Sequence, residues 1–204
     1  EKAITSKTRV IIGVHLYGLM CDVDALRKLA LDKKIHFLED AAQAHGATFG
    51  GNAAGSFGDL ACFSFYPGKN LGACGEGGGI TTNNESYKNH LFRLRNHGSE
   101  KRYYHDELGF NMRMGGLEGA SLSVKLKYLP AWNARRQQIA KRYQGEITNS
   151  KLQMQEIPEG YESVYHLFVV TCDQKEELVA HLKQHSINAA FHYPVPCHLQ
   201  KAYE

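Results

Sequence analysis

Short apolar runs alternate with amphipathic stretches at the start of the chain. Residues 9–15 and 35–39 are runs rich in β-branched and apolar residues, which are typical of buried strands. Between them, Asp22 precedes apolar positions at helical spacing up to about Lys33, so we expect a helix with Asp22 as its N-cap. A strand, a helix and a strand in this order form a βαβ unit, which predicts a parallel sheet.

The pattern beyond this unit predicts further strands and helices. Strands are expected at 60–65, 79–82, 165–170 and from 187 onward. Helices are expected at 85–96, 117–128, 132–146 (after an interruption at Pro130) and 175–185. The pattern of expected elements changes near residues 130–150. The chain after this boundary is therefore interpreted as a second, smaller α+β unit.

Composition and charge exclude several classes of protein. Of 204 residues, 43% are hydrophobic and 22% charged, which is typical of a globular chain and not of a disordered one. The net charge of +3 is too small to predict a nucleic-acid partner. Apolar runs are far shorter than the roughly 20 residues of a membrane span, and the first residues show no signal-peptide pattern. We therefore expect neither nucleic acid nor a membrane as a partner.

The cysteines and histidines do not form a metal-site pattern. The five cysteines are widely spaced and include no Cys-x-x-Cys, which argues against a disulfide framework or a structural zinc site. His181 and His185 are four residues apart, but no Glu follows His181 as a zincin motif requires. We expect a reducing, cytoplasmic location and no metal.

Polar side chains follow two of the expected strands. Asp40 and Gln43 come after the second strand, and Ser64 and Lys69 lie at and after the end of the third. Ligands of open α/β sheets bind at the carboxyl ends of parallel strands, so these residues are candidates for a site. A partly desolvated lysine is a nucleophilic amine that forms a Schiff base with an aldehyde, and pyridoxal phosphate is the common cofactor of that kind. This cofactor also needs an acid beside its ring nitrogen and donors for its phosphate, which Asp40 and Ser64 would supply.

Each of these residues also has an ordinary structural interpretation. Aspartate is common as a helix N-cap, which is a structural interpretation of Asp40. Ser64 fits a polar position on a strand, and Lys69 fits a solvated turn. The loop around Lys69 matches neither a Walker A motif nor Gly-x-Gly-x-x-Gly. Taken singly, the residues leave the function open.

The order of the motifs along the chain is more specific than any one residue. The motifs are Val14-His-Leu-Tyr-Gly18, Glu39-Asp-Ala-Ala-Gln-Ala-His-Gly-Ala47, Gly55-Ser-Phe-Gly-Asp59, Phe63-Ser-Phe-Tyr-Pro-Gly-Lys-Asn-Leu-Gly72, Gly75-Glu-Gly-Gly78, Gly109-Phe-Asn-Met-Arg-Met114 and Phe191-His-Tyr-Pro-Val-Pro-Cys-His-Leu-Gln200. Together they resemble the DegT/DnrJ/EryC1/StrS family of pyridoxal-phosphate-dependent sugar aminotransferases over nearly the whole chain.

The resemblance implies an α/β fold, that of the fold type I pyridoxal-phosphate transferases, which is similar to aspartate aminotransferase. Such proteins have a three-layer αβα large domain and a smaller α+β C-terminal domain. Residues 1–130 would then belong to the large, cofactor-binding domain, and residues 131–204 to a linking helix and part of the small domain. Because family members extend beyond both ends of this sequence, we expect the two domains to be incomplete. A homodimer with active sites shared between the subunits is also implied.

The resemblance also implies roles for individual residues. Lys69 matches the lysine that binds pyridoxal phosphate covalently and carries the proton in transamination. Asp40 matches the partner of the pyridinium nitrogen, Gln43 a residue in contact with the ring or its phenolic oxygen, and Ser64 a ligand of the phosphate.

Three more residues are matched outside this group. Asn111 and Arg113 lie in the segment that reaches the phosphate site of the neighbouring subunit, and the resemblance leaves open which of them makes the contact. His192 matches a position near the sugar substrate.

The implied reaction moves an amino group, from glutamate, to a keto sugar linked to a nucleoside diphosphate, in amino-sugar biosynthesis. A cyclitol aminotransferase is an alternative in the same family, which the sequence Tyr-Pro-Gly-Lys-Asn-Leu-Gly around Lys69 disfavours. The dehydratase-like branch carries His in place of this lysine. A non-catalytic or truncated relative that binds the cofactor is the alternative from another class of protein. The joint presence of Asp40, Gln43, Ser64 and Lys69 argues against it.

Overall fold

The structure, a computed structural model, describes residues 1–203. These residues form two compact units. The first unit comprises Glu1–Ile147 and Gln155–Val169, and the second comprises Thr148–Met154 and the chain from Val170 onward. The predicted assignment of residues 1–130 and 131–204 to a large and a small domain stays a prediction.

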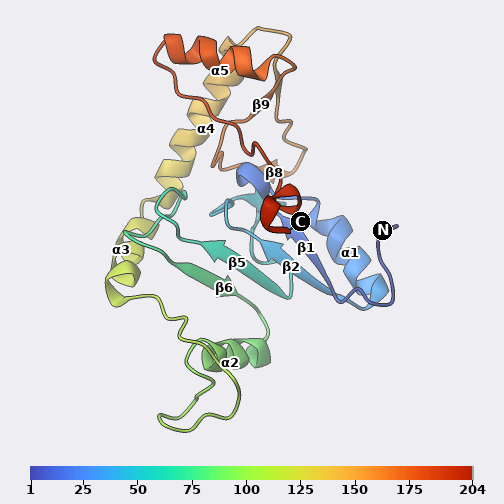
Figure 1. The fold of residues 1–204 in the computed structure, drawn as a ribbon, viewed down its shortest axis with the longest axis vertical. Helices are drawn as coiled ribbons and strands as arrows, with labels where there is room; N and C mark the ends of the chain where they lie inside the picture. The colour runs from blue at the N-terminus through green and yellow to red at the C-terminus, as the bar shows by residue number, and fades with distance from the viewer. Residues whose placement is uncertain (204) are drawn as a thin grey trace. The chain divides into compact units, whose positions relative to one another are not determined.

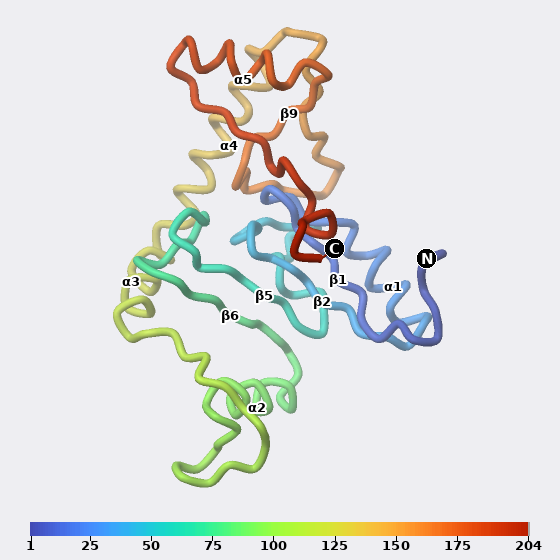
Figure 2. Tube along the Cα trace, in the orientation of Figure 1, coloured from blue at the N-terminus to red at the C-terminus, as the bar shows by residue number. Residues whose placement is uncertain are grey.

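A four-stranded sheet forms the centre of the first unit (Figures 1 and 2). Its strands, in spatial order, are β1 (Val10–Val14), β2 (His36–Asp40), β5 (Leu60–Ser64) and β6 (Gly78–Thr81). β1, β2 and β5 are parallel, whereas β6 is antiparallel to β5. The register places Asp40 opposite Val14 on one side and opposite Cys62 on the other.

Helix α1 (Val23–Lys33) connects β1 to β2 and completes the predicted βαβ unit. Its N-terminus is capped by Asp22, whose Oδ1 accepts a hydrogen bond from the Ala25 amide at 3.1 Å. The helix ends at Lys34, which adopts a left-handed conformation with φ 55°. The predicted strands, helix and cap are therefore confirmed.

The two faces of the sheet have different surroundings. On one face, apolar side chains enter a core that includes α1, and these are Ile11, Phe37, Ala61 and Phe63. On the other face β1 exposes Val10 (43%), Ile12 (61%) and Val14 (47%). Side chains alternate along a strand, so Asp40 and Ser64 belong to this second, open face. Of the implied three layers, the described residues thus contain the sheet and the helical layer on its buried face.

The remaining elements of the first unit are a small sheet and three helices. The antiparallel order of the small sheet is β4 (Asn52–Ala53), β3 (Thr48–Phe49) and β8 (Tyr161–Glu162). The helices are α2 (Glu85–Leu94), α3 (Gly116–Leu126) and α4 (Leu129–Glu146), with a 3-10 turn at Leu16–Gly18. Pro130 lies in the first turn of α4, where no backbone N–H is required, so α4 begins earlier than predicted.

In the second unit, β7 (Gln153–Met154) pairs antiparallel with β9 (Val170–Thr171), and α5 (Lys175–Gln184) follows. Two short 3-10 turns, Cys197–Leu199 and Lys201–Tyr203, end the described chain. None of the helices among residues 1–203 has the length and apolar character that a membrane span requires.

Two predicted strands were wrong. Only residue 170 of the segment 165–170 is in a strand, and residues 187–203 contain no strand. The apolar side chains of the first segment pack against α4 instead, since Phe168 makes an edge-to-face contact with Tyr143 at 5.0 Å between ring centroids. The backbone carbonyls of Tyr165 and His166 accept hydrogen bonds from Arg136 of α4, which takes the place of strand pairing.

Candidate active site

Asp40 lies at the point where the parallel sheet ends. Its backbone carbonyl accepts a hydrogen bond from the His15 amide at 2.9 Å, and the Ala41 amide donates to the Cys62 carbonyl at 2.9 Å. Its side-chain Oδ1 accepts a hydrogen bond from the Ala42 amide at 3.1 Å. This bond orients the carboxylate, and it is the only hydrogen bond that the side chain makes with the described residues.

Ser64 and Gln43 lie beside Asp40 at the same edge. The Ser64 hydroxyl accepts a hydrogen bond from the Tyr66 amide at 3.3 Å, so its own hydrogen can be donated to a ligand. Gln43 is largely buried, and its Oε1 accepts a hydrogen bond from the Tyr17 amide at 2.6 Å. Gln43 therefore ties the chain after β2 to the end of β1, where Tyr17 has φ 62°.

Lys69 follows Ser64 in a tight, well-supported turn. Its amide donates to the Tyr66 carbonyl at 2.9 Å. A Cβ at position 72 would overlap the Pro67 carbonyl, so only glycine allows the turn to close. The Gly72 carbonyl accepts a hydrogen bond from Lys125 of α3. The backbone that carries the Lys69 side chain is therefore fixed on its C-terminal side.

Asn70 attaches the same turn to the interior of the first unit. Its side chain is 5% exposed, and Nδ2 donates to Asn133 Oδ1 and to the Val164 carbonyl, each at 3.0 Å. Its Oδ1 lies 3.2 Å from His166 Nδ1. Asn133 also donates from Nδ2 to the His45 carbonyl at 2.8 Å. The sequence did not predict this network, because its members lie far apart along the chain.

His45 is a buried, neutral ring near Lys69. It is 3% exposed, with ring centroids 5.4 and 5.9 Å from those of Phe63 and Phe65. Among the described residues its two ring nitrogens have no hydrogen-bond partner, and the nearby Ser64 backbone acts to raise its pKa. Burial lowers the pKa of His45 to about 4, and the positive charge of Lys69 adds to this effect. The Lys69 ammonium group thus lies within electrostatic range of the ring.

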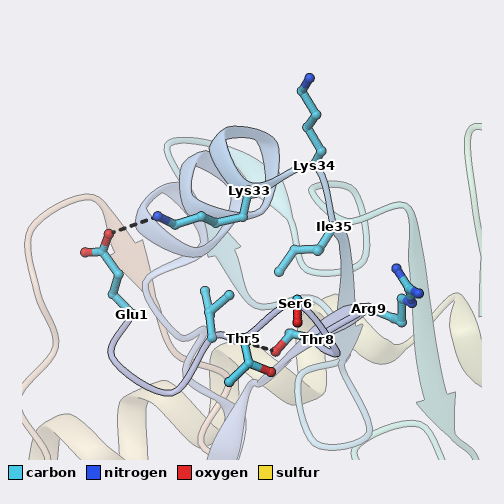
Figure 3. A pocket seen from close by; sticks show the side chains of 9 residues that line it. Glu1, Thr5, Ser6, Thr8, Arg9, Lys33, Lys34 and Ile35 are labelled. Carbon is cyan, nitrogen blue, oxygen red and sulfur yellow. Dashed lines mark hydrogen bonds and ion pairs between the residues drawn. The ribbon is translucent and has the colours of Figure 1, made fainter.

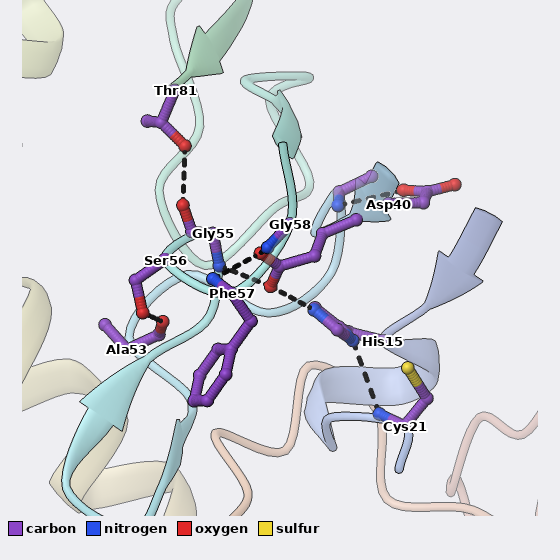
Figure 4. Close-up of polar contacts among 11 residues, drawn as sticks. His15, Cys21, Asp40, Ala53, Gly55, Ser56, Phe57, Gly58 and Thr81 are labelled. Carbon is purple, nitrogen blue, oxygen red and sulfur yellow. Dashed lines mark hydrogen bonds and ion pairs between the residues drawn. The ribbon is translucent and has the colours of Figure 1, made fainter. Parts of the chain in front are cut away.

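Glu39 is a buried carboxylate on the opposite face of β2 from Asp40. It lies 2.9 Å from His15 Nε2 and accepts hydrogen bonds from the amides of Gly55, Phe57 and Gly58 at 2.7–2.8 Å (Figure 4). Burial raises the pKa of Glu39, but these hydrogen bonds more than offset it, so the net pKa is lowered. No role for Glu39 was predicted from the sequence. An acidic residue at a core-facing strand position was the available signal.

Asn111 and Arg113 form a separate cluster. Arg113 donates to Asn111 Oδ1 at 2.9 and 3.1 Å and to Asn96 Oδ1 at 2.9 Å, and it also contacts His97. This cluster belongs to the segment that follows α2 and leads to α3 (Figure 1). The recorded side-chain contacts of the two residues join them to this segment and not to Lys69, so their predicted role in a neighbouring subunit stays a prediction.

His192 belongs to the second unit. It is exposed, and its ring lies 5.0 Å from that of Tyr193. Its predicted position near a sugar substrate stays a prediction.

Two surface hollows lie away from the strand ends. One is formed by the N-terminal loop and the end of α1, with Thr5, Arg9 and Lys34 among its lining residues (Figure 3). The other lies beside α2 and includes Arg113. Neither is lined by Asp40 or Lys69.

The residues at the strand ends have the chemistry that pyridoxal phosphate requires. They offer a carboxylate with an oxygen beyond the one that Ala42 engages, a hydroxyl with a hydrogen to donate, and an amine on a fixed turn. These groups suit a ring nitrogen, a phosphate and an aldehyde, respectively. Within residues 1–203 no group of three or more His, Cys, Asp or Glu is placed to hold a metal ion.

The mixed α/β fold is that of solved aminotransferase structures. Residues 1–204 match the DegT/DnrJ/EryC1/StrS aminotransferase family, and the chain belongs to this family. The fold class expected from the resemblance is confirmed by solved structures of the same family.

Several curated proteins are similar to this chain. It is 42% identical over 204 residues to the dTDP-3-amino-3,4,6-trideoxy-alpha-D-glucose transaminase of Streptomyces venezuelae, covering 100% of this chain and 54% of that protein. It is 45% identical over 203 residues to the dTDP-3-amino-3,6-dideoxy-alpha-D-galactopyranose transaminase of Aneurinibacillus thermoaerophilus, covering 100% and 56%. The chain thus spans about half the length of the curated relatives it matches.

Two solved structures illustrate the similarity. That of S. venezuelae DesV in complex with a ketimine intermediate has a TM-score of 0.96 at 42% identity, covering 99% of this chain and 55% of that chain. That of NtdA from Bacillus subtilis with bound cofactor PMP has a TM-score of 0.90 at 30% identity, covering 98% and 47%.

Proposed function

We propose that the protein is a pyridoxal-phosphate-dependent aminotransferase that moves an amino group from glutamate to a keto sugar linked to a nucleoside diphosphate, in amino-sugar biosynthesis. One observation carries the proposal. In a chain of this family, Asp40 and Ser64 end adjacent parallel strands, and Lys69 follows in a rigid turn. The names of the relatives, which include dTDP-sugar and UDP-sugar transaminases, support the substrate class.

Asp40, Ser64 and Gln43 would hold the cofactor, which when bound supplies an electron sink for the amino-bearing carbon. The Asp40 carboxylate would keep the ring nitrogen protonated, since a nearby negative charge favours the charged form of a base. The Ser64 hydroxyl would donate to the phosphate. Gln43, tied to the end of β1 through Tyr17, would contact the ring or its phenolic oxygen.

Lys69 would carry both the covalent attachment and the proton transfer. As a neutral amine its Nζ would accept the proton from the carbon that bears the amino group, and as an ammonium group it would return it. The fixed backbone of the 66–72 turn supports this role, because proton transfer requires the donor and acceptor to stay within hydrogen-bond reach.

We extend the proposal to a homodimer in which sites are shared. Asn111 or Arg113 would reach the phosphate in the partner subunit, and the exposure of both side chains supports a role toward another chain. His192 would lie near the sugar. A cytoplasmic location fits the five free cysteines.

The first test adds pyridoxal phosphate to the protein and records its visible spectrum before and after glutamate. We expect a band of lysine-bound cofactor that converts to that of the amino form. Lys69→Ala should lose the band, because no other amine would be held in the site, whereas Lys28→Ala on the exposed side of α1 should keep it.

The acceptor is tested with the same preparation. Single-turnover transfer from the amino form of the cofactor to a dTDP-linked or UDP-linked keto sugar should exceed transfer to a free keto-cyclitol. Equal or greater transfer to the cyclitol would contradict the substrate class. Turnover by Lys69→Ala at the wild-type rate would contradict the assignment of the lysine.

A further inference from the structure

The side chain of Asn70, next to Lys69, is fully engaged in the interior of the first unit. Both hydrogens of its amide nitrogen are used, one by Asn133 Oδ1 and one by the Val164 carbonyl. Its oxygen accepts from His166, whose Nδ1 must then carry the hydrogen. These partners lie 63, 94 and 96 residues away along the chain. Asn70 is thus a tertiary anchor and not a feature of the local turn.

Asn133 holds a second loop in addition to the turn of Lys69. Its Oδ1 receives the hydrogen bond from Asn70, while its Nδ2 donates to the His45 carbonyl at 2.8 Å. His45 ends the loop that begins at Asp40 and contains Gln43. A Cβ at Gly46 would lie 2.9 Å from Asn133 Nδ2, so this loop passes close against α4.

We propose that Asn70 and Asn133 form a positioning bridge that sets the spacing between Lys69 and Asp40. The inference rests on the proposed function and deepens it. One rigid helix residue is bonded to the loop of the ring-binding carboxylate and to the turn of the reactive amine. The distance between these two groups is therefore fixed through α4.

The chemistry gives this spacing its importance. Pyridoxal phosphate is a rigid molecule, so an aspartate at its ring nitrogen and a lysine at its aldehyde must stand at one separation. The lysine side chain is a flexible chain of four carbons, so it cannot define that separation by itself. A displacement of about 1 Å at a reacting group costs on the order of a hundredfold in rate. Asn70 and Asn133 touch neither the cofactor nor the substrate in this proposal, so they are positioning residues.

The test compares Asn70→Ala, Asn133→Ala and the double variant with the wild-type protein. Each is incubated with pyridoxal phosphate and treated with borohydride, and the adduct at Lys69 is quantified by peptide mass. The pH midpoint of the visible band is measured in parallel. Val23→Ala, which removes buried methyl groups from α1 without touching the bridge, is the control for loss of stability.

We expect each single variant to lower the yield of Lys69 adduct about tenfold and to move the pH midpoint, as follows from misplacement of the amine. Val23→Ala should leave both readouts unchanged. The double variant should lose no more than the larger single loss, because two residues of one bridge are not additive.

The outcomes separate this inference from the proposed function. A wild-type protein without an adduct at Lys69 would count against the proposed function. A wild-type adduct with an unchanged yield and midpoint in Asn70→Ala would overturn the bridge alone. Should Asn70→Ala fail to fold, Asn133→Ala decides in the same way, since wild-type behaviour in that variant excludes the bridge.

Discussion

Glu39 and Asp40 show how adjacent residues on one strand serve different ends. Their side chains alternate across β2, so Glu39 enters the core and Asp40 faces the open side. Glu39 binds the Gly55–Gly58 loop through three backbone amides and contacts His15, all without exposure to solvent. Its burial as an ion is tolerated because every partner donates to it. Fixing Glu39 in this way also fixes the direction in which Asp40 points.

Glu39→Gln should therefore destabilise the protein by about 3 kcal/mol. The side-chain NH2 group of the glutamine would face N–H donors that now donate to the Glu39 carboxylate. The pKa of Glu39 is lowered in the folded state from 4.5. Its contribution to stability is thus fully present above pH 4.5 and is lost as the pH falls through the lower, folded-state value.

Urea unfolding of both proteins between pH 7 and pH 3 measures this effect. The difference in free energy of unfolding should be constant above the unfolded-state pKa and shrink below it. Glu100→Gln, at an exposed position, is the control and should follow the wild type at every pH. A difference that grows toward low pH would contradict the assignment.

The turn after β5 shows how an element is shaped by packing. Leu71 and Ala73 enter a core cluster with Leu122 and Leu129, which draws the turn onto α3 and α4. Gly72 lies between them, and its position against Pro67 leaves no space for a Cβ. The Gly-rich character of this segment was evident from the sequence, but the need for glycine at position 72 comes from the contact with Pro67.

Gly72→Ala should lower the free energy of unfolding by about 1–3 kcal/mol, the usual cost of overpacking. It should also reduce the yield of lysine-bound cofactor, since the turn that carries Lys69 must move. Gly119→Ala on α3 is the matched control. Nothing lies within 4 Å of a Cβ there, so the variant should gain about 0.5–1 kcal/mol from helix propensity. Thermal melts and the visible spectrum check both expectations.

At the scale of the whole molecule, the described chain leaves one face of its sheet open and keeps Asn111 and Arg113 in a cluster of their own. In the proposed dimer one of these two residues completes the partner's site. Neither Lys69→Ala nor a variant at Arg113 would then be active alone, whereas a mixed dimer would contain one intact site.

Subunit mixing tests this arrangement and decides between Asn111 and Arg113. Lys69→Ala is mixed under mild denaturation with Arg113→Ala or with Asn111→Ala, and amino transfer is measured. Recovery of about a quarter of the wild-type activity is expected for the residue that crosses the interface, because half of the dimers are hybrids with one working site each. Absence of recovery with both variants would contradict shared sites.

The sequence alone determined the local part of this architecture. Apolar runs and a capping aspartate predicted the βαβ unit and α1, because strand and helix periodicity and N-cap chemistry are properties of neighbouring residues. The same order of strands placed Asp40, Gln43, Ser64 and Lys69 near one edge. Ordered motifs around these residues indicated the family.

Tertiary structure decided what depends on residues distant along the chain. The segment 165–170 is apolar for packing against α4, so its composition alone predicted a strand that does not form. The Glu39 contacts, the Asn70–Asn133 bridge and the contact of Asn70 with His166 join residues 16 to 96 positions apart. The hydrogen-bond partners of buried polar groups depend on the whole tertiary structure. Each buried group needs a partner, and that partner can come from any segment that packs beside it.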